Sequence, residues 1–171
     1  VNKVLNEYDF PPLELLHFLL IELKLGRHYK GQFKITKRGA ELLANPAQLL
    51  NTLVPFYILN IDHSSYSRSG EQPFGKWDVW LNVLNVELEN VSTEIELFEV
   101  FYGKLSDAPM AWRATSAFYS CVLCPLCWAG VLLEHRTKGV RRSDAVYLKT
   151  PLWPAWLQLD TDNLVQPAQR H

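Results

Sequence analysis

The sequence predicts a mainly α-helical protein with short β-hairpins, which places it in the α+β class. Three observations predict this class. The 171-residue chain is 48% hydrophobic and 20% charged, which is enough apolar material for a packed core and too much for a disordered chain. Most apolar residues recur at helical spacing. Two short basic segments interrupt that spacing, and each ends at a threonine that suits the start of a helix.

The first expected element is a long apolar helix. Residues 12–25 are apolar on almost every face, which is typical of a helix that is central in its domain. Pro11 and Pro12 suit the entry to this helix, because proline is tolerated in a first turn. Gly26 suits the C′ position that ends it.

A hairpin and two helices are expected to follow. Residues 27–36, RHYKGQFKIT, predict a β-hairpin with Gly31 in its turn. Thr36 then suits the N-cap of a helix over 37–45. Asn45-Pro46 ends that helix and starts another, PAQLLNTLVPFYIL.

The middle of the chain predicts a domain boundary. Residues 60–76 are rich in serine, glycine and other polar residues, which is typical of a linker. The expected units are therefore 1–59 and 77–171. The second unit opens with WDVWLNVLNVELE at helical spacing, and Thr93 with Glu96 predicts a capping box for the next helix.

The remaining elements repeat the order of the first unit. The uncharged stretch Ala114–Leu133 has about the length of a membrane span, but its polar residues and central Pro125 favour a buried pair of helices. A strand, a basic turn and a strand at Ala145–Leu148 follow. Thr150-Pro151 then suits the start of a last helix. Helix, hairpin and threonine-capped helix thus occur twice.

This order is the winged-helix arrangement. The segment FKITKRGAELL looks like the strand, Thr-x-x-Gly and helix ending common in winged-helix proteins. The longer segment LKLGRHYKGQFKITKRGAELLANPAQLLNTLV resembles a family of uncharacterised bacterial proteins with tandem winged-helix units, sometimes found beside a plasmid-type open-reading-frame domain. CPLCWAGVLLEHR followed by AVYLKTPLWPAWL resembles the second unit of that family. The chain departs from the family pattern at Lys149, which intervenes before Thr150, and at Trp153, which replaces a glycine.

The resemblance implies tandem winged-helix-like units, the first of them truncated, and a binding role with no established activity. Only Val1–Asp9 precedes the first helix, and the single methionine is Met110. We therefore expect the parent protein to continue upstream.

The three cysteines, Cys121, Cys124 and Cys127, raise three alternatives. Their spacing suits a soft metal ion or redox chemistry, and His135 would complete a Cys3His zinc site. The same spacing places them near one helical face among apolar residues, and free cysteine packs as a small apolar residue. We favour core thiols. No metal, cofactor or disulfide is expected, which favours a reducing, cytoplasmic compartment.

No pattern of catalytic residues stands out. The sequence has no Ser-His-Asp, His-Glu-x-x-His or Gly-x-Ser-x-Gly signature and no phosphate-binding loop. Asp62, His63 and Ser64 bring catalytic residue types together, but within the expected linker. We therefore predict that the chain is not an enzyme.

The net charge of -1 excludes a generally basic nucleic-acid coat, but the charges are unevenly distributed. Residues 77–103 carry six acids and no lysine or arginine, which we interpret as solvated helix faces. The candidate contact residues are basic and lie in or beside the hairpins: Lys30, Lys34, Lys37, Arg38, Arg136, Lys138, Arg141 and Arg142. They suit solvated hairpin tips, contact with a nucleic-acid backbone, or contact with an acidic protein.

Segments 13–25 and 126–134 are the candidates for the helix that would contact DNA bases in each unit. Their composition decides between two binding functions. Both are largely apolar and carry few side chains that hydrogen-bond base edges. We therefore expect a protein–protein adaptor, whose partner is another protein or the upstream part of the parent protein. The alternative is DNA binding through the basic wings, as in transcription regulators. No membrane contact is expected.

Overall fold

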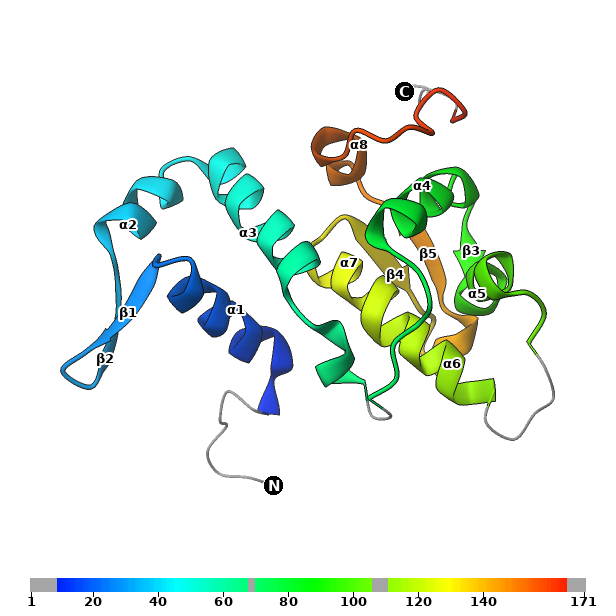
Figure 1. The fold of residues 1–171 in the computed structure, drawn as a ribbon, viewed down its shortest axis with the longest axis horizontal. Coiled ribbons are helices and arrows are strands. Elements are labelled where there is room, and N and C mark those ends of the chain that lie inside the picture. The colour runs from blue at the N-terminus through cyan, green and yellow to red at the C-terminus, as the bar shows by residue number, and fades with distance from the viewer. Residues whose placement is uncertain (1–8, 68–69, 106–110, 166–171) are drawn as a thin grey trace. The chain divides into compact units, whose positions relative to one another are not determined.

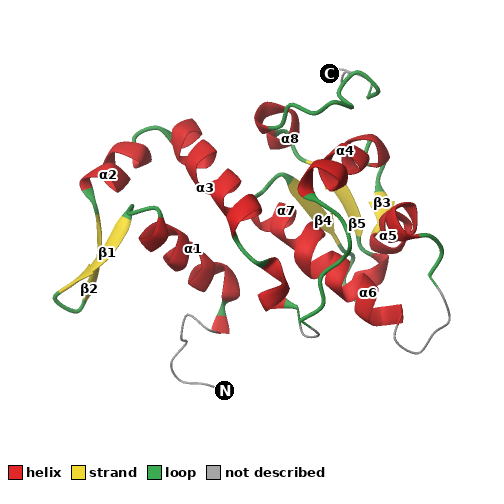
Figure 2. Ribbon diagram, in the orientation of Figure 1, coloured by secondary structure: helices red, strands yellow, loops and turns green. Residues whose placement is uncertain are grey.

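The computed structural model describes residues 9–67, 70–105 and 111–165 and divides the chain into two compact units, Val1–Asn60 and Ile61–His171 (Figure 1). Helices dominate both units, and each unit holds one small antiparallel sheet (Figure 2). The predicted α+β class is therefore confirmed. All six tryptophans belong to the second unit.

The first unit consists of a hairpin and three helices with a small set of buried apolar side chains. In chain order its elements are α1 (Pro11–Glu22), β1 (Gly26–Tyr29), β2 (Gln32–Ile35), α2 (Lys37–Leu43) and α3 (Pro46–Asn60). Helix α1 packs on β1, and α2 packs on α3. The buried apolar side chains are Leu15, Leu19, Leu25, Leu42, Val54, Tyr57 and Ile58. Each helix supplies only a narrow stripe to this core, so most of α1 lies outside it.

Helix α1 ends differently from the expectation. Lys24, and not Gly26, takes the left-handed conformation, with a φ of 57°. The amide of Leu25 donates to the carbonyl of Leu20 at 2.8 Å, and that of Lys24 donates to Ile21 at 2.9 Å. These two bonds form a Schellman ending. Leu25 is thereby turned into the core, which compensates for the strain of a non-glycine residue at this position.

The first hairpin confirms the predicted turn and cap. Lys30 and Gly31 both have positive φ, 50° and 74°, as a type I′ turn requires. The hydroxyl of Thr36 donates to the carbonyl of Lys24 at 2.8 Å and accepts from the amide of Gly39 at 3.1 Å. Thr36 therefore ties the start of α2 to the end of α1.

The second unit surrounds a three-stranded sheet with helices. In chain order its elements are η2 (His63–Tyr66), α4 (Trp77–Glu87), β3 (Ser92–Thr93), α5 (Glu94–Tyr102), α6 (Ala111–Phe118), the π-helical turn η3 (Tyr119–Leu123), α7 (Cys124–Trp128), β4 (Leu132–His135), η4 (Arg142–Asp144), β5 (Val146–Lys149) and α8 (Leu152–Trp156). The strand order is β3-β5-β4, antiparallel throughout. The capping box of Thr93 and Glu96 is present as predicted.

The apolar stretch before β4 forms α6, η3 and α7 in direct succession, and α7 packs on β4 (Figure 1). The π-helical turn immediately precedes the first turn of α7, where Pro125 has no amide proton to donate. The expectation of a helix over 126–134 is wrong in its second half. Gly130, with a φ of 76°, ends the helix, and Leu132 already lies in a strand.

The helix end, hairpin and threonine of the first unit recur in the second. The amide of Val131 donates to the carbonyl of Leu126 at 3.1 Å, which repeats the Schellman ending. The hydroxyl of Thr150 donates to the carbonyl of Gly130 at 2.7 Å and accepts from the amide of Leu152 at 3.2 Å. Both threonines thus donate to the preceding helix end and accept from the start of the next helix, Thr36 from three residues on and Thr150 from two residues on.

The segment expected as a linker, 60–76, contributes ordered contacts to the second unit. His63 and Ser64 are buried there, and the Asp62 carboxylate accepts from the amide of Ser64 at 2.9 Å. Among the described residues no single helix is long and apolar enough to cross a membrane. The pair α2 and α3 meets those two criteria only jointly, across a bend of 115°.

A buried asparagine joins the ends of the second unit. The Asn85 amide nitrogen of α4 donates to the Thr161 hydroxyl at 3.1 Å and to the Asp162 carboxylate at 3.0 Å. Its carbonyl oxygen accepts from the indole nitrogen of Trp153 at 2.9 Å. Lys149 donates to the Asn85 backbone carbonyl at 2.9 Å. This network fixes the chain after α8 against α4.

Candidate functional site

The first hairpin presents three cations around one exposed aromatic ring. Arg27 and Lys34 are cross-strand partners, so their side chains share a face with Tyr29. The guanidinium carbon of Arg27 lies 5.6 Å from the centroid of the Tyr29 ring, and the ammonium groups of Lys30 and Lys34 lie 5.4 and 5.2 Å from it. These are cation–π distances. We call Arg27, Tyr29, Lys30 and Lys34 the basic hairpin face.

Two further candidate residues lie beside this face, in the first turn of α2. Lys37 and Arg38 are both exposed. The Lys37 ammonium lies 4.0 Å from the Glu41 carboxylate one turn along the helix. An exposed pair of this kind contributes little to stability, so both cations stay accessible to a partner.

The four candidates of the second hairpin divide into two groups. Arg136, Lys138 and Arg141 are exposed in the loop between β4 and β5. Arg142 is held inward instead: its guanidinium lies 3.4 Å from the Glu94 carboxylate and 3.9 Å from the centroid of the Tyr119 ring. Arg142, whose side chain is 34% exposed, therefore pairs with a buried carboxyl group, whereas the other three cations of this loop are exposed.

The partner of Arg142 corrects the expectation that the acids of 77–103 are all solvated. Glu94, the first residue of α5, is only 1% exposed. One of its oxygens faces Arg142, and the other has no hydrogen-bond partner among the described residues. Burial raises the pKa of Glu94 to about 7, against the opposing attraction of Arg142. No local sequence signal distinguishes this glutamate from its exposed neighbours.

Polar side chains surround this ion pair. The Tyr119 hydroxyl donates to the Glu134 carboxylate at 3.4 Å. Tyr147, the cross-strand partner of Glu134, is fully buried, and its hydroxyl has no hydrogen-bond partner among the described residues. Burial raises the pKa of both tyrosines. The cluster thus holds a buried carboxyl group beside a partly exposed arginine, and nothing in it orients a nucleophile toward a base.

The three cysteines are free thiols. Burial raises the pKa of Cys121 and of Cys124 to about 11 and that of Cys127 to about 12. Such thiols stay protonated near neutral pH, whereas metal binding and nucleophilic attack require the thiolate. In the described ranges no group of three or more histidine, cysteine, aspartate or glutamate side chains is arranged to hold a metal ion. These observations favour the interpretation as core thiols.

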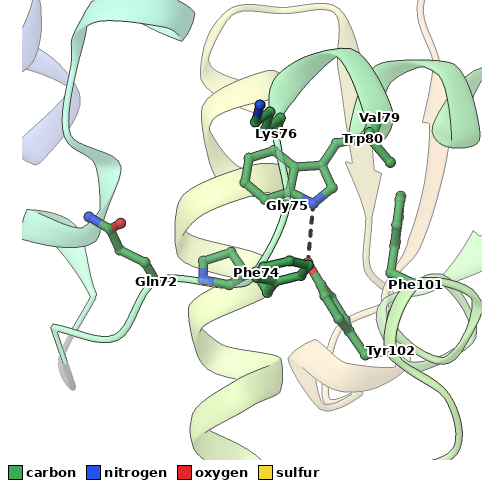
Figure 3. A pocket seen from close by; sticks show the side chains of 9 residues that line it. Gln72, Phe74, Gly75, Lys76, Val79, Trp80, Phe101 and Tyr102 are labelled. Atoms are coloured by element: carbon green, nitrogen blue, oxygen red, sulfur yellow. Dashed lines mark hydrogen bonds between the residues drawn. The ribbon is translucent and has the colours of Figure 1, made fainter.

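The second unit also contains an aromatic pocket that the sequence did not predict. It has a volume of about 680 Å³ and is lined by 72–76, Val79, Trp80, Phe101 and Tyr102 (Figure 3). The Trp80 indole nitrogen donates to the Tyr102 hydroxyl at 3.1 Å across its wall, and the Phe74 ring is 94% exposed. The lining of the pocket is mostly apolar, and Lys76 is the one charged residue in it.

Helix α1 carries the largest apolar surface of the first unit. Leu15 and Leu19 are buried, but Leu13 and Phe18, on other faces of the helix, are 46% and 47% exposed. Leu16 and Ile21 are exposed as well. The sequence predicted the apolar character of this helix but not its exposure, which depends on how little of it the hairpin and α2 cover.

Comparisons with known proteins agree with the division into two parts. Residues 1–48 match the model of the Y4jL N-terminal domain, and residues 67–151 match that of the y4jL C-terminal domain. The uncharacterized protein y4jL of the bacterium Sinorhizobium fredii is 32% identical over 90 residues. That alignment covers 52% of this chain and 41% of the relative, so it spans less than half of that protein. No solved structure matches the chain.

The matches confirm the expected membership of a bacterial family, whereas the winged-helix architecture stays a prediction. Only residues 49–66 and 152–171 lie outside the two family models, which describe the two halves of one protein type. The chain therefore belongs to the y4jL family.

Proposed function

We propose that the chain is a non-enzymatic binding protein and that it contacts another protein through helix α1. The observation that supports this most is the surface of α1. A helix that is apolar on nearly every face is normally buried on nearly every face. In the first unit only the Leu15 and Leu19 stripe of α1 is covered, and Leu13, Leu16 and Phe18 are left exposed.

The proposal includes a winged-helix-like build for both units. Its support is the recurring sequence of a Schellman helix ending, a hairpin and a threonine that returns to that ending. In such a build α1 and α7 would take the place of reading helices. Their apolar side chains suit a protein surface better than a DNA groove, which is read by hydrogen bonds to base edges. The three free thiols suit a reducing, cytoplasmic environment.

Site-specific photocrosslinking in the producing bacterium tests the adaptor function. A photoreactive phenylalanine analogue at position 18 of α1 is expected to capture one defined protein. The same analogue at Leu133, an equally exposed apolar position on β4, is the matched control and is expected to capture nothing specific. The captured protein is then purified, and Leu16→Glu is expected to abolish its binding to the chain. Crosslinks that form only within the chain itself would contradict the proposal.

A second candidate function is contact with a nucleic-acid backbone through the basic hairpin face. Arg27, Lys30 and Lys34 place three positive charges around a Tyr29 ring that is 45% exposed. Cations that track phosphates supply affinity independent of sequence, and an exposed aromatic ring can stack on an unpaired base.

Filter binding with duplex and single-stranded DNA at rising salt tests this candidate. Replacing Arg27, Lys30 and Lys34 by alanine is expected to reduce the slope of log affinity against log salt by about 2–3, since each phosphate contact contributes about 0.7–0.9. The matched control replaces Lys76 and Lys104, two exposed cations outside both hairpins. Absence of binding by the unaltered chain at low salt would exclude the candidate.

A further inference from the structure

Two histidines from different elements of the first unit meet at their ring edges. His17 lies on α1 and His28 on β1. Their Nε2 atoms are 3.0 Å apart, and their ring centroids are 5.0 Å apart. The Schellman ending at Lys24 sets the angle between helix and hairpin, and so it determines that the two rings converge.

A third ring holds this pair in position. Phe33 packs edge-on against both imidazoles, with centroid distances of 4.7 Å to His17 and 5.5 Å to His28. Phe33 is the cross-strand partner of His28, on the hairpin face opposite Tyr29. Its ring occupies space left by Gly26, where a Cβ atom would lie 2.1 Å from the Phe33 Cζ. The two rings are therefore oriented by packing, as a preorganised ligand pair requires.

The separation of the two nitrogens suits a shared metal ion. With metal–nitrogen bonds of about 2.05 Å, nitrogens 3.0 Å apart subtend an angle of about 94° at the ion. Angles near 90° belong to the tetragonal geometry that Cu²⁺ and Ni²⁺ adopt with nitrogen and oxygen ligands, and imidazole is a favourable ligand for both. We propose that His17 and His28 form a two-imidazole site for a divalent transition-metal ion, Cu²⁺ above all.

Within the described part of the chain, water is the available source of the remaining ligands. Among the described residues no third histidine, cysteine, aspartate or glutamate completes a cluster with this pair. His28 is exposed and His17 is partly exposed, so an ion and its water molecules reach the pair. The bound ion would link α1 to the hairpin through one ligand from each. Without it, one neutral imidazole donates a hydrogen bond to the other, which is the competing explanation of the same distance.

Copper titration of the full chain, followed by electron paramagnetic resonance, distinguishes these explanations. We expect one Cu²⁺ with two imidazole nitrogens in its coordination. Loss of a group that only hydrogen-bonds to a metal ligand weakens metal binding by about 10–100-fold. Loss of a ligand itself should cost at least as much, so His17→Gln and His28→Gln should each weaken Cu²⁺ binding by that factor or more. The control is the double variant His135→Gln/His171→Gln, which removes two histidines outside the pair and should keep the affinity. Equal affinity in all four proteins, or a single nitrogen ligand, would overturn the proposal.

Thermal unfolding supplies a second readout that does not depend on spectroscopy of the ion. A metal that binds only the folded first unit raises its melting temperature progressively as the free metal concentration exceeds the dissociation constant. Unaltered chain and control variant should show this rise, and the two glutamine variants should not. A rise that persists in His17→Gln would contradict a site at this pair.

Discussion

The side-chain amide and the backbone carbonyl of the buried residue Asn85 form hydrogen bonds with three later parts of the chain. Asn85 accepts from the Trp153 indole and donates to Thr161 and Asp162, while its backbone carbonyl accepts from Lys149. Side chains so far apart in sequence leave no periodic pattern, so sequence reasoning placed Asn85 merely within a helix.

Replacing this amide should be costly. Asn85→Ala leaves the buried indole N–H of Trp153 without its acceptor, and an unsatisfied buried polar group costs about 1–3 kcal/mol. We expect the free energy of unfolding of the second unit to fall by about that amount in a urea titration. Asn90→Ala, an exposed asparagine just beyond the same helix, should change it by less than about 0.5 kcal/mol. Equal effects would show that the network contributes nothing.

Glu94 makes the second unit sensitive to pH. Burial raises its pKa in the folded state from 4.5 to about 7, so the folded state binds a proton that the unfolded state has already lost. This contribution to stability is fully present below about pH 4.5, declines as the pH rises to about 7, and stays lost above that. Glu94→Gln removes the dependence. Its stability relative to the unaltered chain should therefore rise between these two pH values in urea titrations. A constant difference would contradict the raised pKa.

Sequence reasoning foresaw local features at this scale and missed those set by folding. The hydroxyl caps of Thr36 and Thr93 follow from residues three positions away, and both were predicted. The pairing of Arg142 with Glu94 joins residues from a loop and a distant helix start. It depends on how η4 packs against α5, and composition carries no information on that.

Among the elements, the two hairpins are closed by the same device. Thr36 and Thr150 each donate a hydroxyl proton to the left-handed residue that ends the preceding helix, Lys24 in one case and Gly130 in the other. Each also accepts from an amide at the start of the next helix. One side chain thereby couples two helices and the hairpin between them.

Valine in place of either threonine should weaken only the unit concerned. The substitution removes a hydrogen bond to the start of the next helix, worth about 1 kcal/mol, and leaves a helix-end carbonyl with one bond fewer. We expect Thr36→Val to destabilise the first unit and Thr150→Val the second, each by about 1–2 kcal/mol, as measured by amide hydrogen exchange in β1 and β4. Thr137→Val, in the exposed loop of the second hairpin, should leave both unchanged. A loss spread evenly over both units would contradict this coupling.

The sequence was informative about elements where the signals are short-ranged. The Lys30-Gly31 turn and the alternation around it predicted the first hairpin. Strand β3 escaped prediction, because Ser92 and Thr93 become a strand only through pairing with Val146 and Tyr147. The aromatic pocket escaped it as well, since its wall includes the polar segment 72–76 that was expected to be linker.

For the whole molecule, the decisive fact is that each unit has a core of its own. Leu15 and Leu19 of α1 and Leu42 of α2 are buried in the first unit, and side chains from the sheet, α4, α5 and α7 are buried in the second. Units with separate cores are able to unfold separately.

A glycine in α2 allows a selective test. A Cβ atom at Gly39 would lie 2.2 Å from the carbonyl oxygen of Leu25, so helix and hairpin must move apart. Gly39→Ala should lower the stability of the first unit by about 1–3 kcal/mol, although alanine favours helix. Thermal unfolding followed by circular dichroism should then show two transitions, of which the one from the first unit is shifted to lower temperature. Glu41→Ala, at an exposed position of α2, is the control and should leave the transition within about 0.5 kcal/mol of the original.

All six tryptophans lie beyond residue 60, so the two units differ in their intrinsic fluorescence. Indole emission originates in the second unit, whereas the first unit, whose tyrosines are Tyr8, Tyr29 and Tyr57, emits only weakly and at shorter wavelength. A ligand that quenches or shifts the tryptophan spectrum therefore acts on the second unit, and one that changes helicity without changing that spectrum acts on the first. The tryptophan spectrum and the helicity together therefore indicate, without an added label, which unit has bound a partner.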